Sequence, residues 1–502
     1  MSDLLRGSRL APSRKEIIKF ASSIKSDEKI LRHIISINKA HVIMLVEKGI
    51  IDKSGGSKIL GVLLGLKEKT VPLLDVEDAH MLVEEEVVRK VGLEIGGNLN
   101  LAKSRNDQVV TAIRMELRIE ILNLMELIVN LQESLLHLAE KNTETIIPGY
   151  THLQQAQPTT FAHYLLAQFD VLERSLWRFI ETYRRINLSP MGAGALATSS
   201  FPVSRERVAD LLGFEGLIEN SLDAVSSRDF LLETLAALSI LAVDLSRFAE
   251  DLIIWSSIEF SILEIPDEFT STSSIMPQKK NPEVLEIIRA RMSHILGDFV
   301  ASSTIMKALP STYNMDFQEA TPKLWDAIKT MKENLWMLSE VVRNLKVKEN
   351  ILSRHFTSFL AATELANMLV RNYEVSFRTA HKIVGALVKT LIENGKTLVD
   401  ATPELLSEVS NAFLKKPLLI KSEELEKAID LKSFVESHNV RGGPSKREVE
   451  RMMPHRKMMI RQFRAEISNR RRKIEDSICV LDSLSKFYAA QQKNLNLSPS
   501  SP

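Results

Sequence analysis

The sequence of 502 residues contains a single cysteine, Cys479, so the chain cannot form a disulfide within itself. It has no glycine-rich phosphate loop, no His-x-x-x-His pair and no cysteine cluster, which argues against a nucleotide loop and against zinc. No segment at the N-terminus joins a basic start to an apolar run, as a secretory signal does. These absences predict a cytoplasmic protein that works without a metal or another cofactor.

Neither charge of one sign nor hydrophobicity is concentrated in the chain. The 65 basic and 64 acidic residues nearly cancel, which gives no reason to expect a nucleic acid or a membrane surface as partner. Charged residues interrupt apolar stretches such as 231–255, so none reaches the roughly 18 uninterrupted apolar residues of a membrane span. We therefore expect a small molecule and other copies of the chain as partners.

Long helical patterns are what the sequence does contain. Apolar residues recur every three or four positions over 113–138, 161–186, 231–255 and 285–299, as on the buried face of long amphipathic helices. Other apolar residues lie off these stripes, namely Leu122, Leu127, Leu136, Leu232, Ile240 and Ile253. One partner helix would not cover both sets, so we predict an all-α bundle that assembles with copies of itself.

The changes of pattern along the chain predict three domains. Residues 1–107 have the pattern of shorter helices, residues 108–350 that of the long bundle, and residues 351–502 that of a smaller helical domain with a disordered tail from about residue 491. The basic segment 446–473 has the composition of an RNA-binding helix, but its interspersed methionines favour a helix with one buried face.

Four polar or glycine-containing segments lie at the ends of the expected helices. They are residues 103–108, 148–158, 191–197 and 271–283. Rigid helices hold such loops in fixed positions, which makes them favoured places for binding and catalytic groups. His152 is suited to proton transfer near neutral pH, although a hydrogen-bonded histidine near a helix start would give the same pattern.

The segment 271–283 combines a run of hydroxyl residues with Lys279, Lys280 and Asn281. Helix capping accounts for one hydroxyl and one proline, but not for the lysines and the asparagine. A lysine near a serine can stabilise an alkoxide or a developing carboxylate dianion. The segment therefore has the composition of an anion site with a potential base. By contrast, residues 311–319 fit a polar helix connection as well as a site.

Together these segments resemble the argininosuccinate lyase family of the fumarase and aspartase superfamily. Residues 273–282, Ser-Ser-Ile-Met-Pro-Gln-Lys-Lys-Asn-Pro, are similar to the superfamily's signature loop, and residues 104–108, 149–158 and 311–319 look like this family's own motifs. The resemblance implies a three-domain fold whose long helices form a twenty-helix core in a homotetramer. It also implies active sites shared by three subunits, and cleavage of argininosuccinate to arginine and fumarate, the last step of arginine biosynthesis.

The resemblance implies a role for individual residues. Ser273 would be the catalytic serine on a flexible loop, His152 the catalytic histidine supported by Glu286, and Lys279 a stabiliser of the carbanion. We take Ser273 as the base, although the sequence leaves the reversed roles of Ser273 and His152 open. The implied substrate-binding residues are Ser23, Arg105, Asn106, Thr151, Asn281, Tyr313, Gln318 and Lys323.

The sequence departs from the family pattern at two positions. Thr272 stands where the family usually has glycine, and Thr321 where a substrate-binding lysine is expected, so Lys323 would have to replace that lysine. Two other functions fit the same motifs. One is another fumarate-releasing lyase, such as adenylosuccinate lyase, and the other is a structural protein of the crystallin type.

Overall fold

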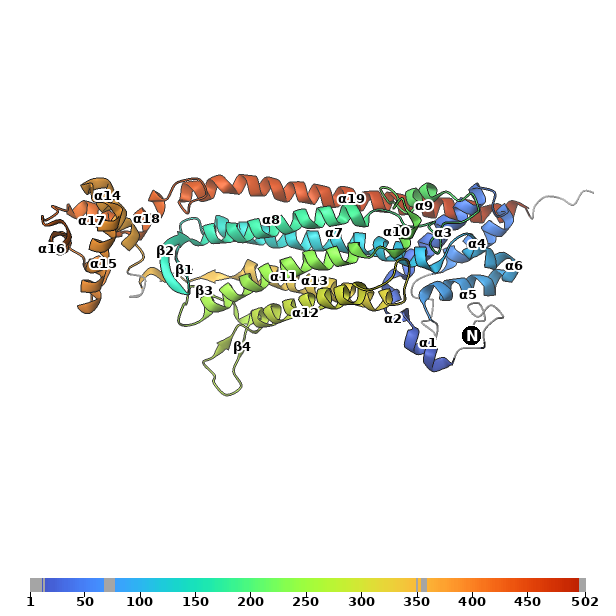
Figure 1. Cartoon of the computed structure of the whole chain (residues 1–502), viewed down its shortest axis with the longest axis horizontal. Coiled ribbons are helices and arrows are strands. Elements are labelled where there is room, and N and C mark those ends of the chain that lie inside the picture. The colour runs from blue at the N-terminus through green and yellow to red at the C-terminus, as the bar shows by residue number, and fades with distance from the viewer. Residues whose placement is uncertain (1–10, 12–13, 67–76, 349–350, 354–358, 496–502) are drawn as a thin grey trace, which may run out of the picture.

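A computed structural model describes residues 11, 14–66, 77–348, 351–353 and 359–495. Long helices run side by side along an elongated molecule (Figure 1). They are α7 (Arg105–Glu140), α8 (Phe161–Ile186), α11 (Asp229–Ser256), α12 (Glu283–Met306) and α13 (Phe317–Asn344). The helices predicted from the four apolar stripes are confirmed, and the predicted all-α class with them.

Shorter helices lie at both ends of this bundle (Figure 1). Before it come α1 (Lys15–Ala21), α2 (Ile24–Asp27), η2 (Glu28–Ile30), α3 (Leu31–Glu47), α4 (Lys53–Gly65), α5 (Ala79–Val91), α6 (Leu93–Gly96) and η4 (Gly97–Asn100). Between the long helices lie α9 (Arg205–Leu211), α10 (Ser221–Ser226) and η5 (Asp267–Phe269). After them come η6 (Ile351–Ser353), α14 (Ala362–Tyr373), α15 (Phe377–Glu393), η8 (Leu398–Asp400), α16 (Pro403–Leu414), α17 (Ser422–Ile429) and α18 (Leu431–Ser437). The chain ends in a further long helix, α19 (Lys446–Leu495), of 50 residues.

Three short antiparallel strand pairs interrupt the helices, which the sequence patterns did not predict. They are β1 (Ile146–Thr151) with β2 (Gln154–Thr160), β3 (Leu263–Glu264) with β6 (Lys346–Val347), and β4 (Ser271–Thr272) with β5 (Lys280–Asn281). The first and third pairs carry two of the polar segments, so these segments are hairpins rather than irregular loops.

Helix α19 returns along the whole bundle and packs against α3, α4 and α7 (Figure 1). Its residues Met453, Met459 and Phe463 are buried as predicted, whereas Met458 is 52% exposed. One continuous hydrophobic core joins α3, α4, α5, the long helices and α19, and a second core joins α14 to α18. The division of the chain at residues 107 and 350 stays a prediction. The disordered tail was predicted from about residue 491, but α19 continues to Leu495. The rest of that tail, residues 496–502, lies outside the described residues.

The basic residues of α19 form ion pairs with acids of the bundle. Arg456 pairs with Asp170 at 2.6 Å, Arg464 with Glu133 at 2.6 Å, and Arg471 with Glu126 at 2.9 Å. The last two pairs are exposed and add little to stability, but all three neutralise charge that a nucleic acid would need. The composition of residues 446–473 is thus explained by packing along the bundle.

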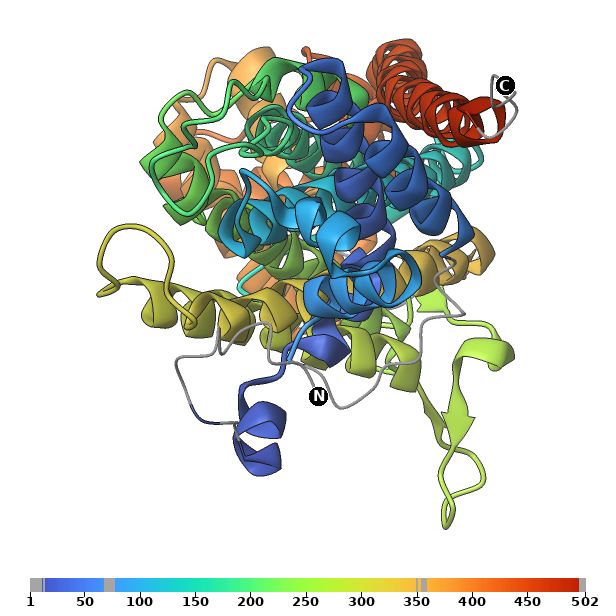
Figure 2. The ribbon, with the colours of Figure 1, turned by 90° about the vertical axis from the view of Figure 1, so that its right-hand side faces the viewer.

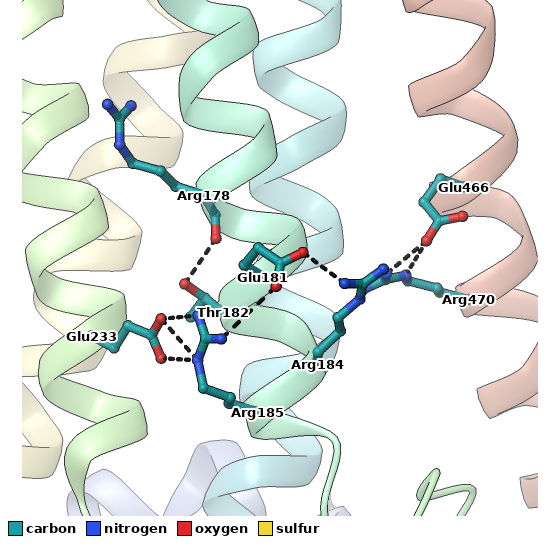
Figure 3. Close-up of polar contacts among 8 residues, drawn as sticks. All are labelled: Arg178, Glu181, Thr182, Arg184, Arg185, Glu233, Glu466 and Arg470. Carbon is teal, nitrogen blue, oxygen red and sulfur yellow. Dashed lines mark hydrogen bonds and ion pairs between the residues drawn. The ribbon is translucent and has the colours of Figure 1, made fainter.

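Polar side chains also join α8 to its neighbours (Figure 3). Arg185 of α8 pairs with Glu233 of α11, and the Arg470 guanidinium of α19 lies 4.3 Å from the centre of the Tyr183 ring. Arg470 is held in place by Glu466, one turn earlier, at 2.6 Å. These contacts fix the rotation of α8 between α11 and α19.

The chain itself covers part of the apolar surface that predicted self-assembly. Leu122 and Leu136 of α7 are buried within the single chain, where α19 packs along that helix, so they give no reason for assembly. On α11, by contrast, Ile240 is 42% exposed. Other exposed apolar residues on the long helices are Trp177, Val243, Ile287, Leu296, Val300 and Trp336. Within the described ranges, no helix is long and apolar enough to cross a membrane.

Candidate active site

His152 lies at the tip of the hairpin formed by β1 and β2, not at a helix start. Thr151 pairs with Gln154, so His152 and Leu153 form a two-residue turn, with φ angles of 57° and 56°. Both residues adopt the left-handed conformation that such turns require and that glycine or asparagine usually supplies. Strained backbone at an exposed histidine is typical of a functional position.

Ser273 lies in a second hairpin, which projects away from the bundle (Figures 1 and 2). Its amide donates to the Lys279 carbonyl at 3.1 Å, and its Oγ accepts from the amides of Ile275 at 3.3 Å and Met276 at 3.1 Å. At the base of the hairpin, Thr272 pairs with Lys280 in extended conformation. Threonine favours this conformation, so the residue that replaces the family's glycine fits its place in β4.

Lys279 and Asn281 lie together in this hairpin. The Lys279 ammonium donates to the Asn281 side-chain oxygen, and both residues lie at the surface. Glu286 follows on the first turns of α12 and is exposed. Among the described residues, no hydrogen bond or ion pair joins Glu286 to His152, so the single chain does not form this expected pair.

Five of the predicted substrate-binding residues meet in one cavity of about 250 Å³. They are Ser23, Arg105, Asn106, Tyr313 and Gln318. The cavity lies where α2, the first turn of α7 and the start of α13 come together. Ser104 caps α7 by accepting from the Asn106 amide at 3.2 Å, which places Arg105 and Asn106 at the cavity.

Acidic residues that the sequence did not point to also line this cavity. Asp78 forms an ion pair with Arg105. Burial alone would raise the pKa of Asp78, but the charges of His80 and Arg105 lower it. Asp27 accepts from the Ser23 hydroxyl at 2.8 Å and from the Ala79 amide at 3.2 Å, and burial raises its pKa to about 6.

Asp27 predicts a pH dependence of stability. Its pKa is raised from 3.8 to about 6, so the folded chain holds this proton more tightly than the unfolded chain does. The resulting stabilisation is present below pH 3.8 and is lost as the pH rises through about 6. We expect the free energy of unfolding of wild type to fall by about 3 kcal/mol relative to Asp27→Asn over this interval. Urea unfolding at several pH values measures it, and a constant difference would contradict the assignment.

Asp107 holds the glycine-containing segment 191–197 against the start of α7. The carboxylate, which is completely buried, accepts from the amides of Gly192 at 3.0 Å and Gly194 at 2.9 Å, and from that of Ser104 at 3.1 Å. Asn106 donates to the Ala195 carbonyl at 3.3 Å. Segment 191–197, held by Asp107, thus helps to position the Asn106 side chain.

Replacing Asp107 by asparagine tests this support. Asparagine offers one oxygen where the carboxylate offers two, so at least one buried amide loses its acceptor. We expect a loss of about 1–3 kcal/mol in the free energy of unfolding. Hydrogen exchange should also become faster at Ser104 or at Gly192 and Gly194, and wild-type exchange at all three amides would refute the role given to Asp107.

The single chain does not bring all the expected groups together. Thr151 and His152 lie on the β1–β2 hairpin and Ser273 on the β4–β5 hairpin, toward the opposite end of the bundle from α2 and the cavity (Figure 1). Another cavity, of about 340 Å³, is lined by His152, Tyr164 and Trp255.

Known proteins match this chain along its length. Two family models match, one described as lyase over residues 67–297 and one as argininosuccinate lyase C-terminal over residues 359–436. The argininosuccinate lyase of Methanocaldococcus jannaschii is 42% identical over 94% of this chain and 97% of its own. The chain belongs to the argininosuccinate lyase family.

Solved structures share the fold of this chain. EDDS lyase in complex with formate superposes with a TM-score of 0.87 and 28% identity, over 97% of this chain and 98% of its own. A class II fumarase from Schistosoma mansoni shares the fold with a TM-score of 0.69 and 18% identity, over 82% of this chain and 91% of its own. The resemblance of the sequence motifs to this family is thus confirmed.

The argininosuccinate lyase pattern leads one to expect a lysine near Gln318, and its replacement by Lys323 stays a prediction. Lys323 does not line the cavity, and its ammonium lies 3.8 Å from an Asp298 oxygen on α12. Thr321 does line the cavity, but its hydroxyl donates to the Phe317 carbonyl at 3.1 Å. Neither residue therefore offers a cation to the cavity of the single chain.

Some residues of the site had a sequence signal and others had none. Asp107 follows Ser104 by three residues, which is the spacing of a capping box. This spacing predicts that the Asp107 carboxylate bonds back to the Ser104 amide at the start of α7. Arg228 lies in a segment that matches the family, yet its residue type alone gives it no role. Asp27 reaches the cavity through contacts that are not visible in the local sequence. Within the described residues, no group of histidine, cysteine and acidic residues is arranged to hold a metal.

Proposed function

We propose that this chain is a cytoplasmic argininosuccinate lyase that works as a homotetramer with active sites shared between subunits. The observation that carries the proposal is the meeting of Ser23, Asn106, Tyr313 and Gln318 in one cavity of a chain 42% identical to a named argininosuccinate lyase. The retained Ser273 and the other expected catalytic groups weigh against a structural role alone.

The residue types suit an elimination. Ser273 removes a proton from the carbon beside a carboxylate, and the electron pair left behind spreads into that carboxylate as a dianion. Lys279, Asn281 and Thr151 donate to it, and each well-placed donor is worth roughly 3–4 kcal/mol by analogy with oxyanion holes. The C–N bond then breaks, and His152 protonates the departing guanidinium nitrogen. The products are fumarate and arginine.

Assembly with other copies would bring the catalytic hairpins to the cavity, which the single chain does not do. The catalytic hairpins and the cavity lie toward different ends of the bundle, so a site containing Ser273, His152 and Asn106 needs more than one copy. The exposed apolar residues of α11, α12 and α13 offer the surface for it, with Val300 at 62% and Trp336 at 56% exposure. Contiguous apolar exposure on long helices is typical of an interface between subunits.

Two substrates separate the candidate functions. Purified protein is given argininosuccinate and, separately, adenylosuccinate, and fumarate is followed by its ultraviolet absorbance. We expect fumarate from argininosuccinate alone. Fumarate from adenylosuccinate alone would identify another lyase of the superfamily, and fumarate from neither would favour a structural protein.

A further inference from the structure

Arg228 is a buried cation without a counter-charge in the candidate cavity. Two cations line this cavity, and Arg105 is paired with Asp78. Arg228 is 3% exposed, and no carboxylate of the described residues lies within ion-pair distance of it. Its Nη1 donates to the carbonyls of Val225 at 3.2 Å and Ser227 at 2.9 Å, while Nε and Nη2 have no partner among the described residues.

This arrangement leaves two donors of the Arg228 guanidinium available to a ligand. A buried donor without a partner has a free-energy cost. The guanidinium carbon lies 4.4 Å from the centre of the Phe317 ring, and this contact recovers part of the cost. Burial and, next, the charge of Arg114 lower the pKa of Arg228 to about 9, so it remains a cation at neutral pH.

We infer that Arg228 binds the carboxylate at the amino-acid end of argininosuccinate. The inference rests on the proposed function and adds a residue to its site. A guanidinium offers parallel donors that match a carboxylate, and the free Nη2 and Nε are such a pair.

The charges of the cavity decide which end of the substrate it receives. Asp27 and Glu77 line it together with Arg228, so the succinate end, with its two carboxylates, would meet like charges. The amino-acid end carries one ammonium and one carboxylate. The Asp27 carboxylate suits the ammonium of the substrate, and the Arg228 guanidinium suits its carboxylate.

Arg118 shows what a purely structural buried arginine looks like in this chain. It is 1% exposed, and its guanidinium lies 4.1 Å from the centre of the Phe214 ring. Both of its Nη atoms are bonded, to Asn187 at 2.8 Å and to the Gly213 and Leu212 carbonyls at 2.7 and 3.0 Å. It does not line the cavity, so Arg118→Lys is the matched control.

Calorimetric binding of L-arginine and of agmatine, which is arginine without its carboxylate, tests the inference. Wild type should bind arginine at least about tenfold more tightly than agmatine. In Arg228→Gln we expect arginine binding to weaken about 10- to 100-fold and agmatine binding to stay unchanged. Arg228→Lys should retain part of the preference, and Arg118→Lys all of it, with a lower unfolding temperature as its only effect.

Equal binding of the two ligands by wild type would overturn the inference, even if no Arg228 variant folds. An equal loss of both ligands in a folded Arg228→Gln protein would also overturn it, because Arg228 would then act only on the shape of the cavity. Turnover of argininosuccinate is measured separately. Its absence in wild type would refute the proposed function, while the arginine and agmatine comparison would still decide the role of Arg228.

Discussion

Ser273→Ala should leave the fold and the oligomer intact and lower fumarate release by roughly 10²–10⁴-fold, the usual contribution of a positioned base. The hairpin lies outside the core, and among the described residues the Ser273 hydroxyl accepts only from the amides of Ile275 and Met276 in that hairpin. Its loss therefore removes little stability. Ultraviolet absorbance of fumarate measures turnover, and light scattering measures the oligomer.

The neighbouring hydroxyl provides the control for this variant. Ser274 is exposed in the same hairpin, so Ser274→Ala changes the loop to a similar degree without touching the proposed base. We expect it to keep most of the wild-type rate. Turnover close to wild type in Ser273→Ala would remove Ser273 from the chemistry and leave His152 as the candidate base.

Two inactive variants should regain activity when their subunits are mixed. Asn106→Ala damages the cavity, and Ser273→Ala damages the hairpin, which lies elsewhere on the chain. If a site takes these residues from different copies, a random mixture contains sites in which both residues are intact. The copy that supplies Asn106 must then be a Ser273→Ala chain, and the copy that supplies Ser273 must be an Asn106→Ala chain. Each condition holds for about half of the copies, so about a quarter of the sites would be restored.

The control for mixing uses two variants of one segment. Ser273→Ala and Lys279→Ala lie in the same hairpin, so every site that receives the hairpin receives one defect. This mixture should stay inactive. If mixed oligomers of Asn106→Ala and Ser273→Ala form and show no recovery, each site is built within one subunit and the proposal of shared sites is wrong.

The long helices could be predicted from the sequence because their signal is local. Apolar residues recur every three or four positions along α7, α8, α11 and α12, and this period alone predicts a helix with a buried face. The path of α19 could not be predicted in the same way. Its basic side chains form ion pairs with acidic residues of α7 and α8, which lie hundreds of residues away in the sequence. A local sequence pattern does not reveal such pairs.

The hairpins and part of the cavity were missed for physical reasons. The turn at His152 and Leu153 has the left-handed backbone of a tight hairpin but lacks the glycine or asparagine that usually marks one. Asp27 of α2 and Arg228, which precedes α11, line one cavity only because these elements pack together with α7 and α13. The motifs predicted which residue types belong to the site, whereas the charge balance of the cavity needed the structure.

The most direct test of this account is the product balance of one reaction. Purified wild-type protein is incubated with argininosuccinate, and both products are measured by chromatography over time. The account predicts that L-arginine and fumarate appear in equal amounts from the start, with Ser273→Ala producing neither above background. Intact argininosuccinate after long incubation with a folded wild-type oligomer, or fumarate released without arginine, would contradict it.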